Sequence, residues 1–414
     1  MAVGFFVSIL LGSVLLALPL SAADGQATPY TDALFTAVTS VCVTGLVTVT
    51  TALHWSLFGK IVILILIQIG GLGIMSIMTV FFLALRRRIS LGSQKLLKES
   101  YNLGQMEGVV GLVKKIVLGT LTVEGAGAVL YACCLVPQYG LRKGVFMSVF
   151  NAVSCFCNAG MDIIGPDSLK PFVSNPLMNI TTMLLIILGG IGFIVWWDIL
   201  NFINSRRGAN RRRNRQLGLH TKLVLIVTAI LVVGGALLIL MFEWSNSRTL
   251  GNLSVPDKLM AALFQSVTTR TAGFETIAQA SFSDATALLS MVLMFIGGSP
   301  LGTAGGMKTT TAALVVLLVC MFIQGEESIV LFNRRISMSN VRTAVVIVSV
   351  GLTVAVTGTL LLTLAADAPF LDAAYEVVSA LGTVGLSRGL TPHLPWAGKV
   401  IIMVIMYIGR IGPI

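Results

Sequence analysis

Four short segments that end in glycine recur at nearly equal distances along the chain. They are Val-Cys-Val-Thr-Gly45, Cys-Asn-Ala-Gly160, Arg-Thr-Ala-Gly273 and Gly-Thr-Val-Gly385, and their final glycines lie 115, 113 and 112 residues apart. An interval this regular indicates one structural unit present four times. Each segment follows a short apolar stretch and precedes a long apolar run. We therefore expect four copies of an apolar helix, a short half-helix, a glycine turn and a second apolar helix.

The composition places these copies in a membrane. Apolar residues make up 56% of the chain and charged residues 11%, whereas ordinary soluble domains are about 25% charged. A crossing helix needs about 20 apolar residues. Eight runs reach that length, at approximately 3–22, 57–85, 112–136, 175–203, 219–243, 285–323, 342–365 and 396–414. The first run lacks the basic start of a signal peptide, and the first copy needs it, so we count it as a span. The sequence predicts an all-α polytopic membrane protein.

The net charge of +11 is concentrated after three of the runs. The clusters are Arg86, Arg87, Arg88, Lys95 and Lys98 after the second run, Arg206, Arg207, Arg211, Arg212, Arg213 and Arg215 after the fourth, and Arg334, Arg335 and Arg342 after the sixth. If each run crosses once, all three clusters lie on one side, which the positive-inside rule makes cytoplasmic. We therefore expect a multi-pass protein of the cell membrane. A topology signal that touches anionic lipid explains 206–215 better than nucleic-acid binding does.

These landmarks divide the chain into four repeats and three linkers. The predicted division is 1–85 for repeat 1, 86–111 for a basic cytoplasmic linker, 112–203 for repeat 2, 204–218 for a second basic linker, 219–323 for repeat 3, 324–341 for a cytoplasmic linker and 342–414 for repeat 4. Because each repeat contains two crossings, every copy enters from the same side. Parallel copies around an axis along the membrane normal give pseudo-fourfold symmetry.

The half-helices share further marks. An aromatic residue stands ten residues before the glycine in three copies and nine before it in the other, at Phe35, Phe150, Tyr375 and Phe264. A small hydroxyl residue follows four positions later in three copies, at Thr39, Ser154 and Ser379. About a dozen residues cannot cross the bilayer, so we expect each half-helix to enter the membrane and return.

The second helices also align with one another. They carry Ile-Gly70-Gly71-Leu-Gly73, Leu-Gly189-Gly190-Ile-Gly192, Ile-Gly297-Gly298-Ser-Pro300 and Ile-Gly409-Arg410-Ile-Gly412. Of these helices, we expect the one in the third repeat to be broken.

Non-helical backbone at membrane depth must line a cavity or be buried in protein. Glycine reaches positive φ without steric cost, so four such turns can present rings of carbonyl oxygens that replace the hydration shell of an ion. The half-helices would direct their electronegative C-terminal ends at the axis, which favours a cation. The expected filter residues, whose backbone carbonyls would bind the ion, are Cys42, Val43, Thr44, Gly45, Cys157, Asn158, Ala159, Gly160, Arg270, Thr271, Ala272, Gly273, Gly382, Thr383, Val384 and Gly385.

With these motifs the chain resembles the Trk/Ktr/HKT potassium transporter superfamily, and among its members the Ktr-type (KtrB-like) membrane subunit, because eight spans are expected rather than ten. Four glycines in the filter imply potassium as the substrate, where serine in the first filter would imply sodium. The resemblance also implies sodium as a candidate activator, no organic cofactor, a homodimer and regulation by a cytosolic nucleotide-binding ring of RCK domains. Family members usually continue well past residues 410–413, so by resemblance we expect an incomplete chain.

A proline and five glycines interrupt the sixth run, which reads Gly-Gly-Ser-Pro-Leu-Gly-Thr-Ala-Gly-Gly-Met-Lys-Thr-Thr-Thr over 297–311. Such a sequence cannot sustain a helix. We expect a loop beneath the third filter segment, and the resemblance implies that it is a gate. The candidate gate residues are Gly297, Gly298, Ser299, Pro300, Gly302, Gly305, Gly306, Lys308 and Arg410. A phosphate-binding loop is disfavoured because Met307 separates Gly306 from Lys308. A purely packing role for the small residues remains open.

Five charged residues are further candidates. Arg410 replaces a glycine of the other copies and is expected to face the pore as an electrostatic barrier, the alternative being a side chain that extends to the membrane surface. Glu124 is expected to hydrogen-bond a neighbouring helix, and Arg270 to brace the filter turn. Asp162 and Glu275 follow filter glycines by two residues and would concentrate cations at the outer mouth.

The favoured function is potassium uptake through the four-segment filter. The alternatives are an alternating-access cation or solute carrier, a Trk/HKT-like transporter with sodium permeability, and a membrane scaffold whose glycines serve packing. No nucleophile–base pair or carboxylate dyad stands out in the sequence, so an enzyme is not expected.

Overall fold

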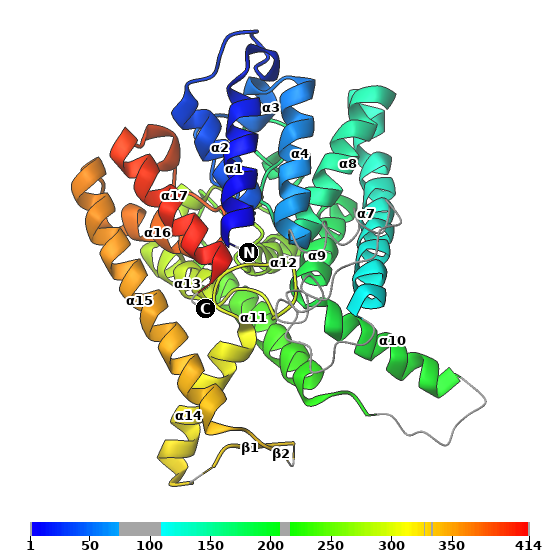
Figure 1. Ribbon diagram of the computed structural model, residues 1–414, viewed down its shortest axis with the longest axis vertical. Helices are drawn as coiled ribbons and strands as arrows, with labels where there is room; N and C mark the ends of the chain where they lie inside the picture. Colours follow the sequence, from blue (N-terminus) through cyan, green and yellow to red (C-terminus); the bar gives the residue numbers. More distant parts are fainter. Residues whose placement is uncertain (1, 74–108, 208–215, 327, 333, 413–414) are drawn as a thin grey trace.

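The computed structural model describes residues 2–73, 109–207, 216–326, 328–332 and 334–412, and these are mainly helical (Figure 1). The α-helices are α1 (Ala2–Ala17), α2 (Tyr30–Cys42), α3 (Thr51–His54), α4 (Leu57–Leu72), α7 (Val109–Tyr139), α8 (Leu141–Cys157), α9 (Pro176–Gly190), α10 (Phe193–Arg207), α11 (Leu219–Glu243), α12 (Val255–Thr268), α13 (Asp284–Phe295), α14 (Thr309–Gln324), α15 (Met338–Ala366), α16 (Phe370–Gly382) and α17 (Trp396–Ile411). Short 3-10 turns occur at Pro19–Ser21, Lys170–Phe172, Gln279–Ser281 and Thr391–His393. Two short strands, β1 (Val330–Leu331) and β2 (Arg334–Arg335), pair antiparallel.

Three of these helices, α7, α11 and α15, are long and apolar enough to cross a membrane, and the bent pair α9–α10 is a fourth candidate. The shorter apolar helices α1, α4, α13 and α14 occupy other predicted runs. The helical class and the presence of membrane-span candidates are therefore confirmed, while the count of eight crossings stays a prediction. The clusters at 86–98 and 211–215, and the second half of run 57–85, lie outside the described residues.

The fourth run does not form the single helix that the sequence predicted. It divides into α9 and α10, which are bent by 98°. The break falls at Gly192, whose φ of +93° is a conformation that side-chain-bearing residues rarely adopt. The second long helix of the repeat is thus interrupted in the second copy as well as in the third. In the third copy residues 296–308 separate α13 from α14.

Local sequence explains where several helices begin. Ser56, Asn175, Ser254 and Ser283 each accept a hydrogen bond through the side chain from a backbone N–H one turn into the following helix. Such N-caps satisfy amide groups that have no partner inside the helix. The caps set the start of α4, α9, α12 and α13, and so the register in which these helices reach the centre of the molecule.

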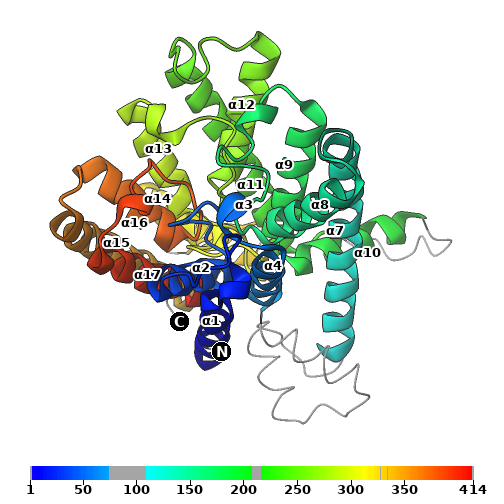
Figure 2. The same cartoon turned by 90° about the horizontal axis from the view of Figure 1, so that it is seen from above.

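Seen from above, four groups of helices surround a common centre (Figure 2). Within the groups α1 packs on α2, α7 on α8, α11 on α12 and α15 on α16. Between the groups α4 packs on α8, α9 on α12, α13 on α16 and α17 on α2, which closes the ring. An ion pair reinforces the closure between the first and last groups, because Nζ of Lys399 lies 2.6 Å from Oδ1 of Asp32.

Candidate functional site

The four glycine segments, defined as residues 42–45, 157–160, 270–273 and 382–385, meet at the centre of this ring. A Cβ atom added to Gly45 would lie 2.8 Å from the carbonyl oxygen of Ala159, and one on Gly160 would lie 2.8 Å from that of Ala272. A Cβ on Gly273 or on Gly385 would overlap the backbone of the next segment in the same way. Each glycine is therefore fitted against the following segment, and the series closes on itself. No larger residue fits at these four places.

The segments share one backbone conformation. In each, the residue two positions before the glycine also has positive φ, namely Val43 (53°), Asn158 (57°), Thr271 (69°) and Thr383 (50°). Side-chain-bearing residues seldom adopt this conformation, and four of the eight described cases in the chain fall at these equivalent positions. Local strain of this kind persists only where the surrounding structure imposes it, and it clusters at functional sites.

Hydroxyl groups hold the turns from behind. Oγ1 of Thr39 accepts a hydrogen bond from the backbone N–H of Gly45 at 2.9 Å, and Oγ of Ser379 accepts one from Gly385 at 3.0 Å. Ser154 bonds both backbone groups of Met161. In the third copy Thr268 donates to the carbonyl of Phe274 at 2.7 Å. Sequence reasoning missed Thr268, although it stands four residues after Phe264, as the other three hydroxyls stand after their aromatic residues.

Each glycine segment also contains a buried side-chain oxygen that has no hydrogen-bond partner among the described residues. These atoms are Oγ1 of Thr44, Oδ1 of Asn158, Oγ1 of Thr271 and Oγ1 of Thr383. A buried acceptor without a partner is costly. Each segment therefore has a buried oxygen whose hydrogen-bonding capacity the described residues leave unfilled.

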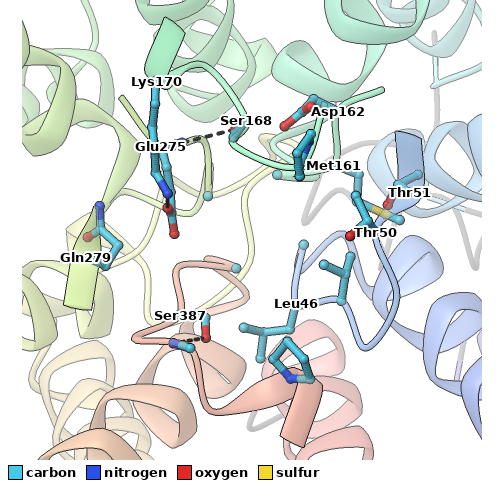
Figure 3. Close-up of a pocket in the computed structure, with 18 of the residues that line it drawn as sticks. Leu46, Thr50, Thr51, Met161, Asp162, Ser168, Lys170, Glu275, Gln279 and Ser387 are labelled. Atoms are coloured by element: carbon cyan, nitrogen blue, oxygen red, sulfur yellow. Dashed lines mark hydrogen bonds and ion pairs between the residues drawn. The ribbon is translucent and has the colours of Figure 1, made fainter. Parts of the chain in front are cut away.

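A cavity of about 330 Å³ opens above the four glycines, which line it together with Asp162 and Glu275 (Figure 3). The sequence did not reveal that a lysine side chain also lines this cavity. Nζ of Lys170 is 3.3 Å from Oε2 of Glu275, and the backbone N–H of Leu169 donates to the carbonyl of Glu275 at 3.0 Å. The pairing joins two loops 105 residues apart, so no local pattern could have predicted it.

Burial raises the pKa of both Asp162 and Glu275 above the ordinary values of their side chains. For Asp162 the hydrogen bond with Ser168 opposes the shift, and for Glu275 the ammonium of Lys170 does. Both carboxyl groups therefore titrate closer to neutral pH than exposed ones do.

On the other side of the segments lies the loop between α13 and α14, and it contacts three of them. Thr303 accepts a hydrogen bond from Nδ2 of Asn158 at 2.9 Å and donates to the carbonyl of Phe156 at 2.8 Å. A Cβ on Gly297 would lie 3.2 Å from Cγ2 of Thr271, and one on Gly305 would overlap Oγ1 of Thr383. The residues of positive φ in copies two, three and four thus each touch the loop.

The loop is fixed to the bend of α9–α10 as well. The carbonyl of Gly190 accepts from the backbone N–H of Ser299 at 2.8 Å, that of Gly189 accepts from Thr303 at 3.0 Å, and that of Leu301 accepts from Phe193 at 3.0 Å. Within the loop, Nζ of Lys308 donates to the carbonyl of Ala304 at 2.8 Å. The remaining candidate gate residues, Gly298, Pro300, Gly302 and Gly306, lie in the same loop.

Arg410 joins the loop to the first group of helices. Its guanidinium donates to the carbonyls of Thr303 and Gly70, each at 2.5 Å. The side chain therefore turns inward onto the loop and does not extend to the membrane surface. Nη2 of Arg270 lies 3.5 Å from the carbonyl of Gly297, so this side chain reaches the loop, and its role as a brace of the third turn stays a prediction.

The paired glycines of the second helices allow these helices to approach the half-helices closely. A Cβ on Gly70, Gly189 or Gly409 would overlap the carbonyl oxygen of Val41, Phe156 or Leu381 respectively, each one residue before the end of α2, α8 or α16. These glycines therefore allow close packing between helices, in addition to interrupting the helices in which they lie. Glu124 of α7 accepts hydrogen bonds from Nε2 of Gln68 of α4 at 3.2 and 3.3 Å, as the sequence predicted.

Comparison with known proteins agrees with this architecture. A family model described as "Cation transport protein" (TrkH) matches residues 6–414. The Ktr system potassium uptake protein B of Bacillus subtilis is 41% identical over 414 residues, which cover 100% of this chain and 90% of that protein. The potassium/sodium uptake protein NtpJ of Enterococcus hirae is 41% identical over 415 residues, covering 99% of this chain and 90% of that protein. The crystal structure of the potassium transporter TrkH from Vibrio parahaemolyticus has the same fold, with a TM-score of 0.74 at 20% identity over 99% of this chain and 83% of that one.

Proposed function

The chain belongs to the TrkH family of cation transport proteins, and from this premise we propose that it takes up potassium ions through the four glycine segments. The observation that carries the proposal is the closed ring in which each glycine is fitted against the backbone of the next segment. Backbone carbonyls so arranged can replace the hydration shell of an ion. The relatives named above as potassium uptake proteins support potassium as the ion.

Three further features support a cation. The C-terminal ends of α2, α8, α12 and α16 lead directly into the segments, so their electronegative ends face the centre. The unpartnered side-chain oxygens of the four segments, three hydroxyls and one amide oxygen, all carry lone pairs that can coordinate a cation. Asp162 lines the outer cavity with no ion pair to any described residue, so its charge can attract cations there, whereas Glu275 is paired with Lys170. Membership of a family of cation transport proteins agrees with the expectation that the chain is not an enzyme.

The loop 297–311 is proposed as the gate. It touches the residue of positive φ in three segments, and Arg410 ties it to Gly70 in the first group of helices. An ion leaving the segments on this side meets the loop. Opening therefore requires the hydrogen bonds of Thr303 and Arg410 to break, and the guanidinium adds positive charge to the barrier.

The remaining expectations are part of the same proposal. The ends of α14 and α15 and the pair β1–β2, with the exposed Arg334 and Arg335, lie at the opposite end of the molecule from α3, which borders the outer cavity (Figure 1). This supports a multi-pass cell-membrane protein with four repeats whose basic ends are cytoplasmic. The name "Ktr system" of several relatives supports a partner subunit, for which we propose a nucleotide-binding RCK ring, with the membrane subunit as a homodimer.

The test compares two substitutions that impose the same backbone cost. Gly273 (φ +79°) is crowded by the neighbouring segment, whereas Gly25 (φ +73°) has nothing within 4 Å. Radioactive rubidium uptake into proteoliposomes should be lost, or lose its preference over sodium, in Gly273→Ala and stay unchanged in Gly25→Ala. Equal uptake and selectivity in both variants would refute the filter.

Sodium permeability is a second candidate, favoured by the relative whose name includes sodium. Measuring sodium uptake without potassium, in the same vesicles, distinguishes the two. An alternating-access carrier would instead transport solutes larger than a bare cation. In such a carrier the contacts of the loop would change in every transport cycle. Sodium activation would appear as faster rubidium uptake when sodium is added.

A further inference from the structure

An open apolar groove of about 490 Å³ lies between α7 and the bend of α9–α10. Its walls are Leu118, Gly119, Thr122 and Val123 of α7 and Leu188, Ile191, Trp196, Trp197, Ile199 and Leu200 of the bent pair, with Lys115 at one end. None of these residues belongs to the glycine segments or to the loop 297–311. A straight helix in place of α9 and α10 would not form this hollow, so the bend at Gly192 creates it.

Charge makes the groove selective. Lys115 is the charged residue among those that line it, its side chain is exposed, and it forms no ion pair with any described residue. Its ammonium lies 5.7 Å from the ring centroid of Trp197. An apolar slot with a lysine ammonium near one end, unpaired with any described carboxylate, matches a molecule with a long hydrocarbon tail and an anionic head.

We propose that this groove binds one anionic phospholipid. The acyl chain lies along Leu118, Val123 and Leu200, and the phosphate pairs with Lys115. The position of Lys115, six residues into α7, agrees with a headgroup at the membrane surface on the side where the basic clusters are predicted. Lysine at a membrane surface commonly extends toward the headgroups.

The same bend anchors the loop 297–311. Nε1 of Trp196 donates to the carbonyl of Leu188 at 3.0 Å, which fixes the groove wall across the bend. Two residues of the bend, Gly190 and Phe193, hold Ser299 and Leu301 of the loop. A lipid seated in the groove therefore stabilises the loop in the position seen in the structure. Lipid binding does not depend on the proposed function, but this effect on ion flow rests on it.

Photoactivatable phosphatidylglycerol, with the reactive group on an acyl chain, tests the binding in proteoliposomes that contain the full chain. Mass spectrometry should find the label on 115–123 and 188–200. Unlabelled phosphatidylglycerol should displace it at about fivefold lower mole fraction than phosphatidylcholine does, which is the effect of one lysine near an anionic surface. Lys115→Gln should abolish this preference.

Lys143 provides the matched control, because it is also exposed and lies 5.7 Å from the ring centroid of Tyr139, beyond the opposite end of α7. Lys143→Gln should leave the displacement unchanged. Equal displacement by the two lipids, or the same preference in Lys115→Gln as in the unaltered protein, overturns the proposal. Rubidium uptake should fall as phosphatidylglycerol is added, except in Lys115→Gln. Failure of transport in every lipid would contradict the proposed function and leave the binding result intact.

Discussion

The hydroxyl of Thr303 offers a direct test of the proposed gate, because one atom joins the loop to the second glycine segment. Oγ1 accepts from Nδ2 of Asn158 and donates to the carbonyl of Phe156, and all three residues are buried. Thr303→Val keeps the shape of the side chain and removes both hydrogen bonds. Oδ1 of Asn158 already has no partner among the described residues, so the substitution leaves the side-chain amide of Asn158 with none of them as a partner in the present loop position.

The magnitude follows from these two unpaired groups. A buried donor or acceptor that loses its partner costs about 1–3 kcal/mol, so the two together destabilise the loop position by at least about 2 kcal/mol. This shifts the ratio of open to closed loops by a factor of about 30, since about 1.4 kcal/mol corresponds to tenfold. If the loop is closed most of the time, rubidium uptake without any partner protein should rise by about tenfold to thirtyfold.

Uptake is measured in proteoliposomes, with thermal unfolding of the purified protein as the check that the fold is intact. Thr303→Ser retains the hydroxyl and should transport at the original rate. Thr120→Val is the second control, because Thr120 lies in α7, outside the loop, and its buried Oγ1 has no hydrogen-bond partner within the described residues. If folded Thr303→Val transports no faster than these two controls, the loop is not the barrier that we propose.

Three more outcomes are expected. Arg410→Gln removes a guanidinium that bonds two carbonyls. Its uptake without a partner should therefore increase several-fold, and an unchanged rate would contradict the barrier role. Ser379→Ala leaves the N–H of Gly385 without its acceptor and should lower selectivity for rubidium over sodium, as read from competition between the two ions. Burial raises the pKa of Glu275, so acidifying the outside should protonate this side chain at a higher pH than it would protonate an exposed glutamate. Uptake should slow over the same pH range. Glu275→Gln should flatten this part of the pH profile of uptake. A profile as steep as that of the unaltered protein would show that Glu275 does not cause the pH dependence.

The sequence allowed much of the candidate site to be located. The spacing of Gly45, Gly160, Gly273 and Gly385 predicted four equivalent turns, because glycine is needed wherever backbone must approach backbone, and that need leaves a mark at each position. The proline and glycines of 297–311 predicted the interruption between α13 and α14 for a similar reason. Such signals are local, since they depend on what a residue does to its own backbone.

Other features depended on packing between distant segments. The ion pair of Lys170 with Glu275, the reach of Arg270 to Gly297 and the two bonds of Arg410 join parts of the chain from 27 to 340 residues apart. Each partner is a single charged or carbonyl group without a repeating pattern, so the sequence could not pair them. The bend at Gly192 was equally hidden, because the same Gly-Gly-x-Gly pattern also stands at the end of α4, at residues 70–73.

By itself, then, the sequence determined the elements, which are apolar helices, four strained turns and one broken helix. Each is predictable because its residues restrict the conformation of their own backbone. The tertiary structure decided which groups meet: the closed ring of turns, the loop held beneath three of them, and the groove beside the α9–α10 bend. Contacts of this kind depend on how helices pack in three dimensions, and a side chain such as Lys115 or Arg410 carries no record of its neighbour in the residues beside it.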